Sequence, residues 1–588
     1  GKSPDEEPMS KRAKSRVRRA RPTIPTTPPR PEPDPPLMGP GERRLTLPNL
    51  DVDSTQTSSD APATEVPASP LADAVSEPGP GAPDDNAPAV PRIGQPAVAL
   101  DLGPGSADTA VNPETSPPTA ATKEPSVQEH QVLLSSEIFR AYDIRGVVGE
   151  TLDREVARQI GLAVGSLALD SLATPVVVGR DGRHSGPDLV AGLVEGIAAA
   201  GCDVIDIGAV PTGALYYSAY ELGQGSGVMV TGSHNPPEYN GLKIMIGGRT
   251  LAGDNIYGLY ERIRSDNLRS GAGKLSQREM LTAYQARIAG DVKLARPLRI
   301  VADAGNGIGG SCMGDILRAV GAEVITLYEE GDGDFPNHHP DPSEPKNLTD
   351  LIHSVKHTGA DLGVAFDGDA DRLGVVTPDG EIIFSDRLMM LFIREILSRH
   401  PGQTIIYDVK CTGHLHGIIE AAGGVPEMYK TGHSLIKNRM KEVDAPFAGE
   451  MSGHFFFKDR WYGFDCGIYS ACRLLELLAR EEGKPVDVLA ALPNSVSTPE
   501  LKVHMREGEN HDFIAQFQKS ASFPGARINT IDGVRADFAD SWGLVRASNT
   551  TPILVLRFDA DSEDALRRVQ AAFRAQLLAV RDDLELPF

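Results

Sequence analysis

Three segments of the sequence share one order of elements, which limits the chain to a small set of folds. Each segment has an apolar strand, a polar or glycine-rich turn, a helix-length stretch, and then glycine before a second strand. The segments span residues 175–207, 298–327 and 404–429. Short β-branched runs separated by helices favour buried, parallel or mixed sheets that helices cover. We therefore predict three similar mixed-sheet α/β domains.

The sequence changes character on both sides of this repeated region. After about residue 494, a strand pattern at 553–558 and an amphipathic helix pattern at 563–581 predict a smaller α+β domain. At the other end, no aromatic residue precedes Phe139, and 26 of the 46 prolines lie within the first 130 residues. Such a segment lacks the apolar groups that would offset its chain entropy, so we predict that it is disordered.

These patterns predict four folded domains, three α/β and one α+β, around a central cleft into which their loops project. The predicted parts are a proline-rich disordered tail (1–133), α/β domain I (134–278), α/β domain II (279–381), α/β domain III (382–493) and α+β domain IV (494–588).

The charge balance argues against a nonspecific nucleic-acid binder. The chain has 58 basic and 81 acidic residues, a formal charge of -23, so we predict no nucleic-acid partner. Within the tail, residues 11–30 carry eight basic and no acidic residues, whereas residues 31–134 carry sixteen acidic and four basic ones. The basic run either folds back on the acidic stretch or contacts an anionic membrane surface or an acidic protein.

The cysteine spacing and the hydropathy of the chain indicate the cellular compartment. The five cysteines show no C-x-x-C spacing, so they suggest neither a zinc site nor a disulfide framework. No run approaches the roughly 18 apolar residues of a membrane helix, and no apolar stretch near the start resembles a signal peptide. We expect a cytoplasmic protein.

A strand pattern over residues 227–232 runs into a tight, proline-stopped loop that would expose the Ser233 hydroxyl, a good position for a nucleophile. The hydrolase elbow G-x-S-x-G is absent because Asn235 stands two residues later, so a hydroxyl that carries phosphate is favoured over acyl chemistry. Lys243 could return beside Ser233 and exchange protons with a substrate hydroxyl. The alternatives are a turn that satisfies its own backbone and a surface lysine.

Three carboxylates, those of Asp367, Asp369 and Asp371, follow an apolar strand at alternate positions, so in extended backbone they project to one side. They repel one another unless a cation lies among them, and an all-carboxylate ligand set favours Mg²⁺. An acidic turn is one alternative; an EF-hand is disfavoured because Arg372 and Pro378 stand where its Gly and Glu belong. Arg372 could brace a transferring phosphoryl group.

Two later loops carry groups that suit a phosphorylated sugar. Glu450, Ser452 and His454 bring a carboxylate, a hydroxyl and an imidazole into one glycine-flanked loop, which suits hydrogen bonding to vicinal hydroxyls. Near the C-terminus, Arg546 precedes a row of short polar residues at 548–550, and such a loop can grip a phosphate dianion. An ordinary polar turn is the alternative for the second loop.

In order and spacing, the loops at 231–236, 367–372, 449–454 and 546–550 resemble those of the α-D-phosphohexomutases, most closely the bacterial phosphomannomutase/phosphoglucomutase group. The resemblance covers about residues 134–588. It implies that Ser233 is a phosphoserine and, through its phosphate, the fourth protein ligand of Mg²⁺ beside the three aspartates. It also implies glucose 1,6-bisphosphate as activator and a monomeric catalytic core.

The same resemblance implies roles for the remaining residues. Arg372, Lys243 and His234 would assist phosphoryl and proton transfer. The implied substrate contacts are Tyr142, Arg145, Lys410, His433, Glu450, Ser452, His454, Arg546, Ser548, Asn549 and Thr550.

The expected activity is reversible phosphoryl transfer between the 1- and 6-positions of mannose and glucose phosphates through a hexose 1,6-bisphosphate. A phosphoglucosamine mutase is the closest alternative, but its sugar loop usually has Gln where Met451 stands. A metal-dependent phosphatase and a noncatalytic scaffold are alternatives of other classes. Nucleotide-sugar and polysaccharide synthesis are the processes that such products commonly feed.

Overall fold

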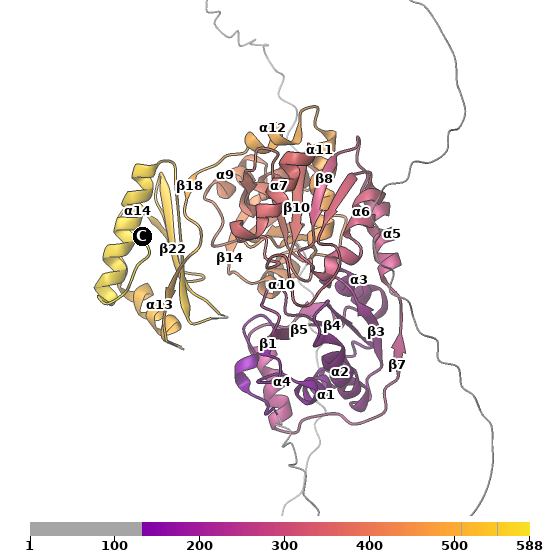
Figure 1. Cartoon of the computed structure of the whole chain (residues 1–588). Helices are drawn as coiled ribbons and strands as arrows, with labels where there is room; N and C mark the ends of the chain where they lie inside the picture. Colours follow the sequence, from indigo (N-terminus) through magenta and orange to yellow (C-terminus); the bar gives the residue numbers. More distant parts are fainter. Residues whose placement is uncertain (1–131, 507, 550) are drawn as a thin grey trace, which may run out of the picture. The chain divides into compact units, whose positions relative to one another are not determined.

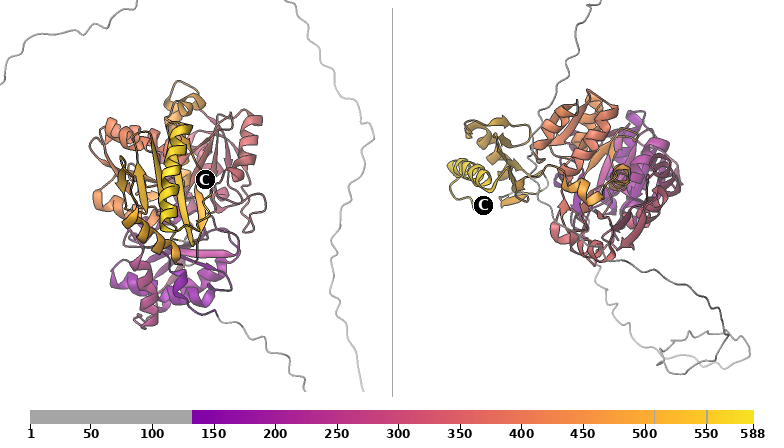
Figure 2. Two further views of the ribbon diagram at one scale, coloured as in Figure 1. Left: turned by 90° about the vertical axis from the view of Figure 1, so that its left-hand side faces the viewer. Right: turned by 90° about the horizontal axis from the view of Figure 1, so that it is seen from above.

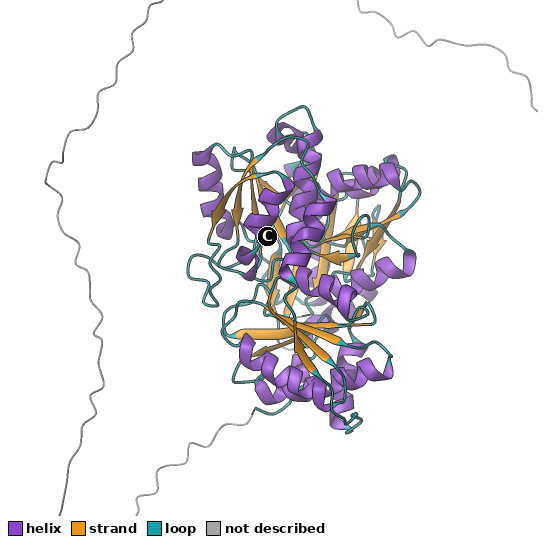
Figure 3. Cartoon of the chain, turned by 90° about the vertical axis from the view of Figure 1, so that its right-hand side faces the viewer, coloured by secondary structure: helices purple, strands orange, loops and turns teal. Residues whose placement is uncertain are grey.

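The computed structural model describes residues 132–588 except 507 and 550. These residues form four β-sheets in sequence order, with helices against them (Figures 1 and 3). We call each sheet with its helices a domain, numbered first to fourth. The predicted disordered tail, 1–133, lies outside the described residues except for its last two, of which Val132 packs in the core of the first domain. No helix in the described part is long and apolar enough to cross a membrane.

The first domain has a seven-stranded mixed sheet in the order β1-β5-β4-β2-β3-β7, with β6 paired to β5. Strands β2, β3, β4 and β7 run parallel, and β5 is antiparallel to β4 and β1. Helix α1 begins where the Asp153 side chain accepts a hydrogen bond from Val156 N. The elements are η1 (Ser136–Ile138), β1 (Ile144–Val147), α1 (Arg154–Asp170), β2 (Val176–Arg180), α2 (Gly186–Ala199), β3 (Val204–Ala209), α3 (Thr212–Leu222), β4 (Gly227–Val230), β5 (Tyr239–Ile246), β6 (Arg249–Thr250), α4 (Asp254–Arg264) and β7 (Leu275–Gln277).

The second domain has a five-stranded sheet in the order β12-β11-β10-β8-β9. Its central strand β10 runs parallel to β8 and antiparallel to β11, and all five of its residues are buried. The elements are α5 (Leu281–Asp291), β8 (Arg299–Asp303), η2 (Ile308–Ser311), α6 (Met313–Val320), β9 (Glu323–Leu327), η3 (Pro345–Leu348), α7 (Thr349–Thr358), β10 (Leu362–Phe366), β11 (Leu373–Val376) and β12 (Ile382–Ile383).

The third domain repeats this plan in the order β14-β13-β15-β16-β17, with β13 parallel to both neighbours and an antiparallel extension through β16 and β17. The elements are α8 (Ser385–Arg399), β13 (Thr404–Asp408), α9 (His414–Ala421), β14 (Val425–Tyr429), α10 (His433–Val443), β15 (Phe447–Gly449), β16 (Phe455–Phe457), β17 (Phe464–Asp465), α11 (Gly467–Arg480) and α12 (Pro485–Ala490). The three predicted α/β units are therefore confirmed.

The fourth domain differs because its sheet, in the order β18-β23-β22-β21-β20 with β19 paired to β23, is wholly antiparallel. Helix α14 lies against this sheet (Figure 2). The elements are β18 (Val496–Ser497), β19 (Leu501–His504), α13 (Glu509–Ser520), β20 (Arg527–Asn529), β21 (Val534–Asp537), β22 (Ser541–Ala547), β23 (Ile553–Ala560) and α14 (Glu563–Val580). The predicted α+β domain, including its strand at 553–558 and final helix, is confirmed.

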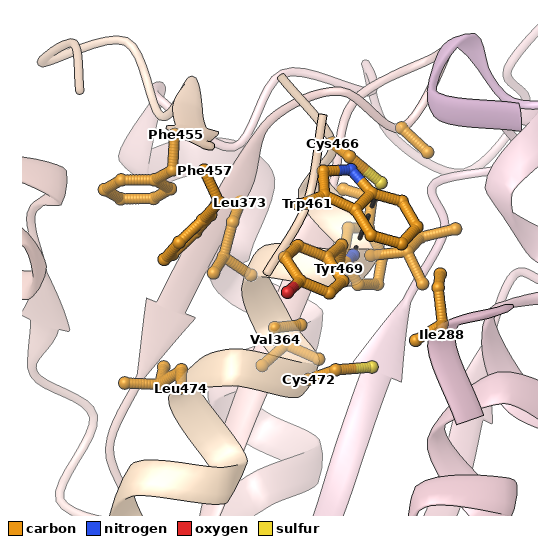
Figure 4. Packing of buried hydrophobic residues seen from close by; sticks show 14 of the residues in the cluster. Ile288, Val364, Leu373, Phe455, Phe457, Trp461, Cys466, Tyr469, Cys472 and Leu474 are labelled. Carbon is orange, nitrogen blue, oxygen red and sulfur yellow. Dashed lines mark hydrogen bonds between the residues drawn. The ribbon is translucent and has the colours of Figure 1, made fainter. Parts of the chain in front are cut away.

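One apolar core runs through the first three domains, whereas the fourth has a core of its own. In the shared core the Trp461 ring stacks on Tyr469, with centroids 4.1 Å apart (Figure 4). Only a small cluster of Val409, Trp542 and Leu544 joins the third domain to the fourth among the described core clusters. The fourth domain therefore meets the others through polar contacts more than through a common core.

Candidate active site

Loops from all four domains line one cavity of about 740 Å³. The loops follow the carboxyl ends of β4, β10, β13 and β15 and the end of β22, where strand ends bring polar residues together. The predicted site residues on its wall are Tyr142, Arg145, Ser233, His234, Lys243, Arg372, Lys410, His433, Glu450, Ser452, His454, Arg546, Ser548 and Asn549. Thr550, also predicted, lies outside the described residues.

Ser233 follows β4 in a left-handed backbone conformation, with φ of 50°. Such a φ is uncommon for a residue other than glycine, so the surrounding structure must hold it. The residue is 3% exposed and lines the cavity. Its Oγ lies 3.2 Å from Asp367 Oδ2 and 3.2 Å from His234 Nδ1.

A buried ion pair after β2 holds this loop. The Arg183 guanidinium donates to the backbone oxygens of four loop residues, Ser233, Asn235, Pro236 and Tyr239, at 2.6 to 3.0 Å. Its partner carboxylate, 3.2 Å away on Asp181, accepts from the Thr231 hydroxyl and Gly232 N. A guanidinium fork suits this task because it offers five donors in a fixed plane.

The three aspartates form a buried carboxylate cluster, defined here as Asp367, Asp369 and Asp371, whose oxygens lie within 4.8 Å of one another. The extended backbone that we predicted for them is wrong. The segment turns after β10, with Ala370 at φ of 59°, and Asp367 Oδ1 accepts from the backbone N of Asp371 and Arg372. The turn, and not strand alternation, brings the three side chains together.

The electrostatics of the carboxylate cluster fit a metal ion. All three residues are fully buried, and Oδ1 of Asp369 and of Asp371 has no hydrogen-bond partner among the described residues. Burial and the neighbouring carboxylates raise the pKa of Asp367 well above its ordinary value. A divalent cation would relieve both the repulsion and the missing contacts. A second group, Asp371 with His454 and Asp465, also lies close enough to hold an ion, but an all-oxygen set suits a hard cation better.

Two cations face the carboxylate cluster. Lys243, on β5, is 2% exposed and its Nζ lies 2.6 Å from Asp369 and 2.5 Å from Asp371, so it is not a surface lysine. Burial lowers the pKa of Lys243, but the two carboxylates outweigh it and hold the pKa well above its ordinary value. Arg372 Nε lies 3.7 Å from Asp367 and donates to His454 Nε2 at 3.1 Å.

The loop at 449–454 lies directly beside these cations. Arg372 and His454 form an antiparallel β-bridge, and Glu450 Oε1 accepts from Gly432 N at 2.6 Å. Burial raises the pKa of Glu450 to about 7. Burial, together with the charge of Lys437, lowers the pKa of His433 well below its ordinary value.

Lys410 and Arg546, which we call the cationic pair, also line the cavity. Each has a carboxylate partner that the sequence analysis missed: Lys410 Nζ lies 2.5 Å from Glu500, and Arg546 Nε lies 3.0 Å from Asp532. Beside them, Asn549 of the fourth domain donates to the Tyr142 hydroxyl of the first at 2.5 Å.

Other residues escaped the sequence analysis for different reasons. Asp181 and Arg183 stand in a charged turn directly after a buried strand, the same signal that identified the carboxylate cluster, so they could have been found. Asp465 lies 3.0 Å from His454 Nδ1 and 2.8 Å from Lys437 Nζ. It follows a short phenylalanine-rich segment without any distinguishing pattern.

Comparison with known proteins agrees with this geometry. Four family models match in order: phosphoglucomutase/phosphomannomutase alpha/beta/alpha domain I at residues 136–269, domain II at 281–380, domain III at 384–496 and the C-terminal domain at 500–576. A phosphomannomutase/phosphoglucomutase of Pseudomonas putida is 54% identical over 455 residues, covering 77% of this chain and 98% of the relative.

A phosphoglucomutase of Neisseria gonorrhoeae is 50% identical over 446 residues, covering 75% of this chain and 97% of the relative. Among solved structures, a phosphoglucomutase/phosphomannomutase family protein from Burkholderia thailandensis superposes with a TM-score of 0.74 at 51% identity. The match covers 78% of this chain and all of that one.

Proposed function

Because the chain belongs to the phosphoglucomutase/phosphomannomutase family, we propose that it interconverts the 1- and 6-phosphates of mannose and glucose. The reaction would run through a phosphoserine and a hexose 1,6-bisphosphate. The observation that carries this proposal is that one cavity is lined both by Ser233, whose Oγ lies 3.2 Å from Asp367 of the carboxylate cluster, and by the cationic pair. We call the part at Ser233 the reacting end and the part at the cationic pair the resting end. Such a cavity suits a substrate with one reacting and one resting phosphate.

The carboxylate cluster and the phosphate on Ser233 would hold Mg²⁺, which neutralises charge on the transferring phosphoryl group when bound. In the first transfer the Oγ–P bond of phosphoserine 233 breaks as a bond forms between phosphorus and the free sugar oxygen, the sugar hydroxyl gives up a proton and Ser233 Oγ takes one. In the second transfer the other O–P bond of the bisphosphate breaks as phosphorus bonds to Ser233 Oγ, which gives up a proton, and the released sugar oxygen takes one. We propose Lys243 as the carrier of that proton and Arg372 as the brace for the phosphoryl oxygens, with His234 beside Ser233.

The remaining residues would orient the sugar and its resting phosphate. Glu450, Ser452 and His454 suit the sugar hydroxyls. The residues proposed to surround the rest of the substrate are Tyr142, Arg145, Lys410, His433, Arg546, Ser548, Asn549 and Thr550. Between the two transfers the 1,6-bisphosphate turns end for end, with glucose 1,6-bisphosphate acting as activator because it phosphorylates Ser233.

The test is ³¹P spectroscopy of the purified protein with Mg²⁺, a trace of glucose 1,6-bisphosphate, and glucose 1-phosphate, mannose 1-phosphate or glucosamine 1-phosphate in parallel. Formation of the 6-phosphate from both glucose 1-phosphate and mannose 1-phosphate supports the proposal. Release of inorganic phosphate would point to a phosphatase, conversion of glucosamine 1-phosphate in preference to both sugars to a phosphoglucosamine mutase, and no reaction with any of them to a scaffold.

We also propose domain boundaries at 134–278, 279–381, 382–493 and 494–588 and a monomeric catalytic core. A cytoplasmic location is supported by the five cysteines, all free and buried. The proposed contact of residues 11–30 with an anionic membrane or an acidic protein lies outside the described residues. Deleting residues 1–30 and measuring sedimentation with anionic vesicles tests the membrane contact.

A further inference from the structure

Glu500 places a carboxylate inside the cavity, against a residue proposed to hold phosphate. It stands directly before β19 of the fourth domain and its Oε1 lies 2.5 Å from Nζ of Lys410, which follows β13 of the third. The Lys410 side chain is 8% exposed and that of Glu500 is 35% exposed. A close ion pair therefore crosses from one domain to the other within the cavity.

The surroundings of Glu500 are strongly cationic. Burial works to raise the pKa of Glu500, but the charges of Lys410, Arg546 and Arg557 outweigh it, so the pKa is lowered and the carboxylate is ionised at neutral pH. In addition, Arg546 Nη2 is buried with no hydrogen-bond partner among the described residues. The carboxylate thus occupies an anion-binding environment that still has a free donor.

A substrate phosphate needs the same cations. A phosphate dianion carries more charge and more acceptor oxygens than a carboxylate, so it can displace Glu500 from Lys410 and also use the free donor of Arg546. Glu500 cannot keep its place once phosphate contacts Lys410, since two anions there repel. Because about a third of its side chain is exposed, the displaced carboxylate can turn towards water without being buried unpaired.

We propose that Glu500 competes with the resting phosphate for Lys410, so that binding of phosphate to the cationic pair stays readily reversible. This inference rests on the proposed function, in which the bisphosphate must leave the cationic pair and turn between two transfers. If the phosphate were bound too tightly at the resting end, that turn would be slow. A carboxylate that returns to Lys410 stabilises the emptied site and so speeds release.

A role for Glu500 in orienting Lys410 would predict the opposite change in phosphate affinity. If Glu500 merely orients Lys410, its removal weakens phosphate binding, because the lysine loses its position. If Glu500 competes, its removal strengthens binding and slows the turn. The sign of the change in affinity therefore separates the two.

The test is calorimetric binding of glucose 1-phosphate, and separately of inorganic phosphate, to the full chain carrying Ser233→Ala, with and without Glu500→Gln. We expect Glu500→Gln to lower the Kd about three- to tenfold. With Ser233 intact, Glu500→Gln should lower both KM and kcat for glucose 1-phosphate. An unchanged or raised Kd in a folded variant overturns the proposal.

Two controls keep the result specific. Glu427→Gln removes a carboxylate of similar exposure, 24%, that lies 2.6 Å from Arg439 outside the cavity, and it should leave Kd unchanged. An equal tightening in Glu427→Gln would mean a general charge effect and overturn the proposal. In a Lys410→Met background, Glu500→Gln should lose most of its effect, as a double-mutant cycle would show. Because binding needs no turnover, failure of the proposed mutase activity leaves this readout intact.

Discussion

The reacting end and the resting end of the cavity differ in their balance of acidic and basic groups. At one end the carboxylate cluster sets three acidic groups against Lys243 and Arg372, and two of its oxygens have no hydrogen-bond partner among the described residues. At the other end each member of the cationic pair already has one carboxylate, Glu500 or Asp532. The first end therefore has more acidic than basic groups, whereas the second has one carboxylate for each cation.

This difference agrees with the proposed division, in which one end reacts and the other holds the resting phosphate. An excess of buried negative charge favours a divalent cation, and a cation there would act directly on a transferring phosphoryl group. A balanced pair exchanges one anion for another, which suits repeated binding and release of a phosphate. The loops agree with this division, because Ser233, in a left-handed conformation, is held by Arg183 at the reacting end, and the third and fourth domains supply the resting end.

Removing the metal should give the largest loss of turnover, and it should leave the resting end unchanged. We expect chelation with EDTA to lower turnover of glucose 1-phosphate by about 10³-fold or more. Binding of glucose 1-phosphate, measured by calorimetry, should change by no more than about threefold, since the cationic pair is untouched. Added Mg²⁺ should restore turnover. Loss of binding in parallel with turnover would show that the two ends do not divide the work.

Replacing Arg183 by lysine should give the next largest effect. A lysine keeps the charge but cannot hold four backbone oxygens at once, so Ser233 loses its fixed position. We expect kcat to fall about 10²-fold with KM within about threefold of the wild type, in steady-state kinetics.

The matched control is Arg473→Lys, since Arg473 is equally buried but lies in an ion-pair network outside the cavity. It should lower thermal stability and leave kcat of the folded enzyme near the wild-type value. If both variants lose kcat alike, Arg183 acts through stability alone.

At the resting end, Arg546→Gln should act mainly on KM. It removes a buried guanidinium that offers a free donor, so we expect KM for glucose 1-phosphate to rise roughly tenfold or more, with a smaller change in kcat. Arg527→Gln, an exposed arginine of the same domain, serves as control and should leave KM unchanged. A fall in kcat with constant KM would place Arg546 at the reacting end instead.

The smallest expected effect is the pH dependence of KM that Glu450, in the loop at 449–454, contributes. Glu450 is ionised above its pKa of about 7 and takes up a proton below it. The titratable groups around it are His454, Asp408 and Lys410, and Gly432 N donates to it. The protonated form accepts hydrogen bonds from sugar hydroxyls less well, so KM should rise about threefold between pH 8 and 6.

Titration of the substrate phosphate is common to the wild type and Glu450→Gln, so the variant is the reference. KM profiles measured side by side should differ only through Glu450. Parallel profiles would mean that Glu450 does not contact the sugar.

Much of this site could be predicted from sequence because its groups are local. Ser233, the carboxylate cluster and the loop at 449–454 each follow a buried strand in a short polar segment. The predicted order of strands and loops was therefore enough to locate them at strand ends. Glu500 and Asp532 could not be found in this way. Glu500 is a single carboxylate whose partner, Lys410, lies 90 residues away in another domain.

The backbone of the carboxylate cluster also escaped prediction. Alternate spacing of Asp367, Asp369 and Asp371 suggested a strand, but Ala370 adopts a left-handed conformation. That conformation depends on tertiary contacts, since Gly467 N bonds to Ala370 O and Thr212 N to Asp369 O. Sequence spacing identified the three carboxylates as candidate ligands, and long-range packing determined their geometry.

The central claim is that Ser233 passes its phosphoryl group to the sugar at the reacting end. The most direct test is a pulse–chase experiment. Enzyme ³²P-labelled on Ser233 is mixed with excess unlabelled glucose 1-phosphate and quenched over milliseconds to seconds. The account predicts that the label leaves Ser233 and appears first in glucose 1,6-bisphosphate and then in the hexose monophosphate. Label that stays on Ser233 during turnover, or that appears as inorganic phosphate, would contradict it.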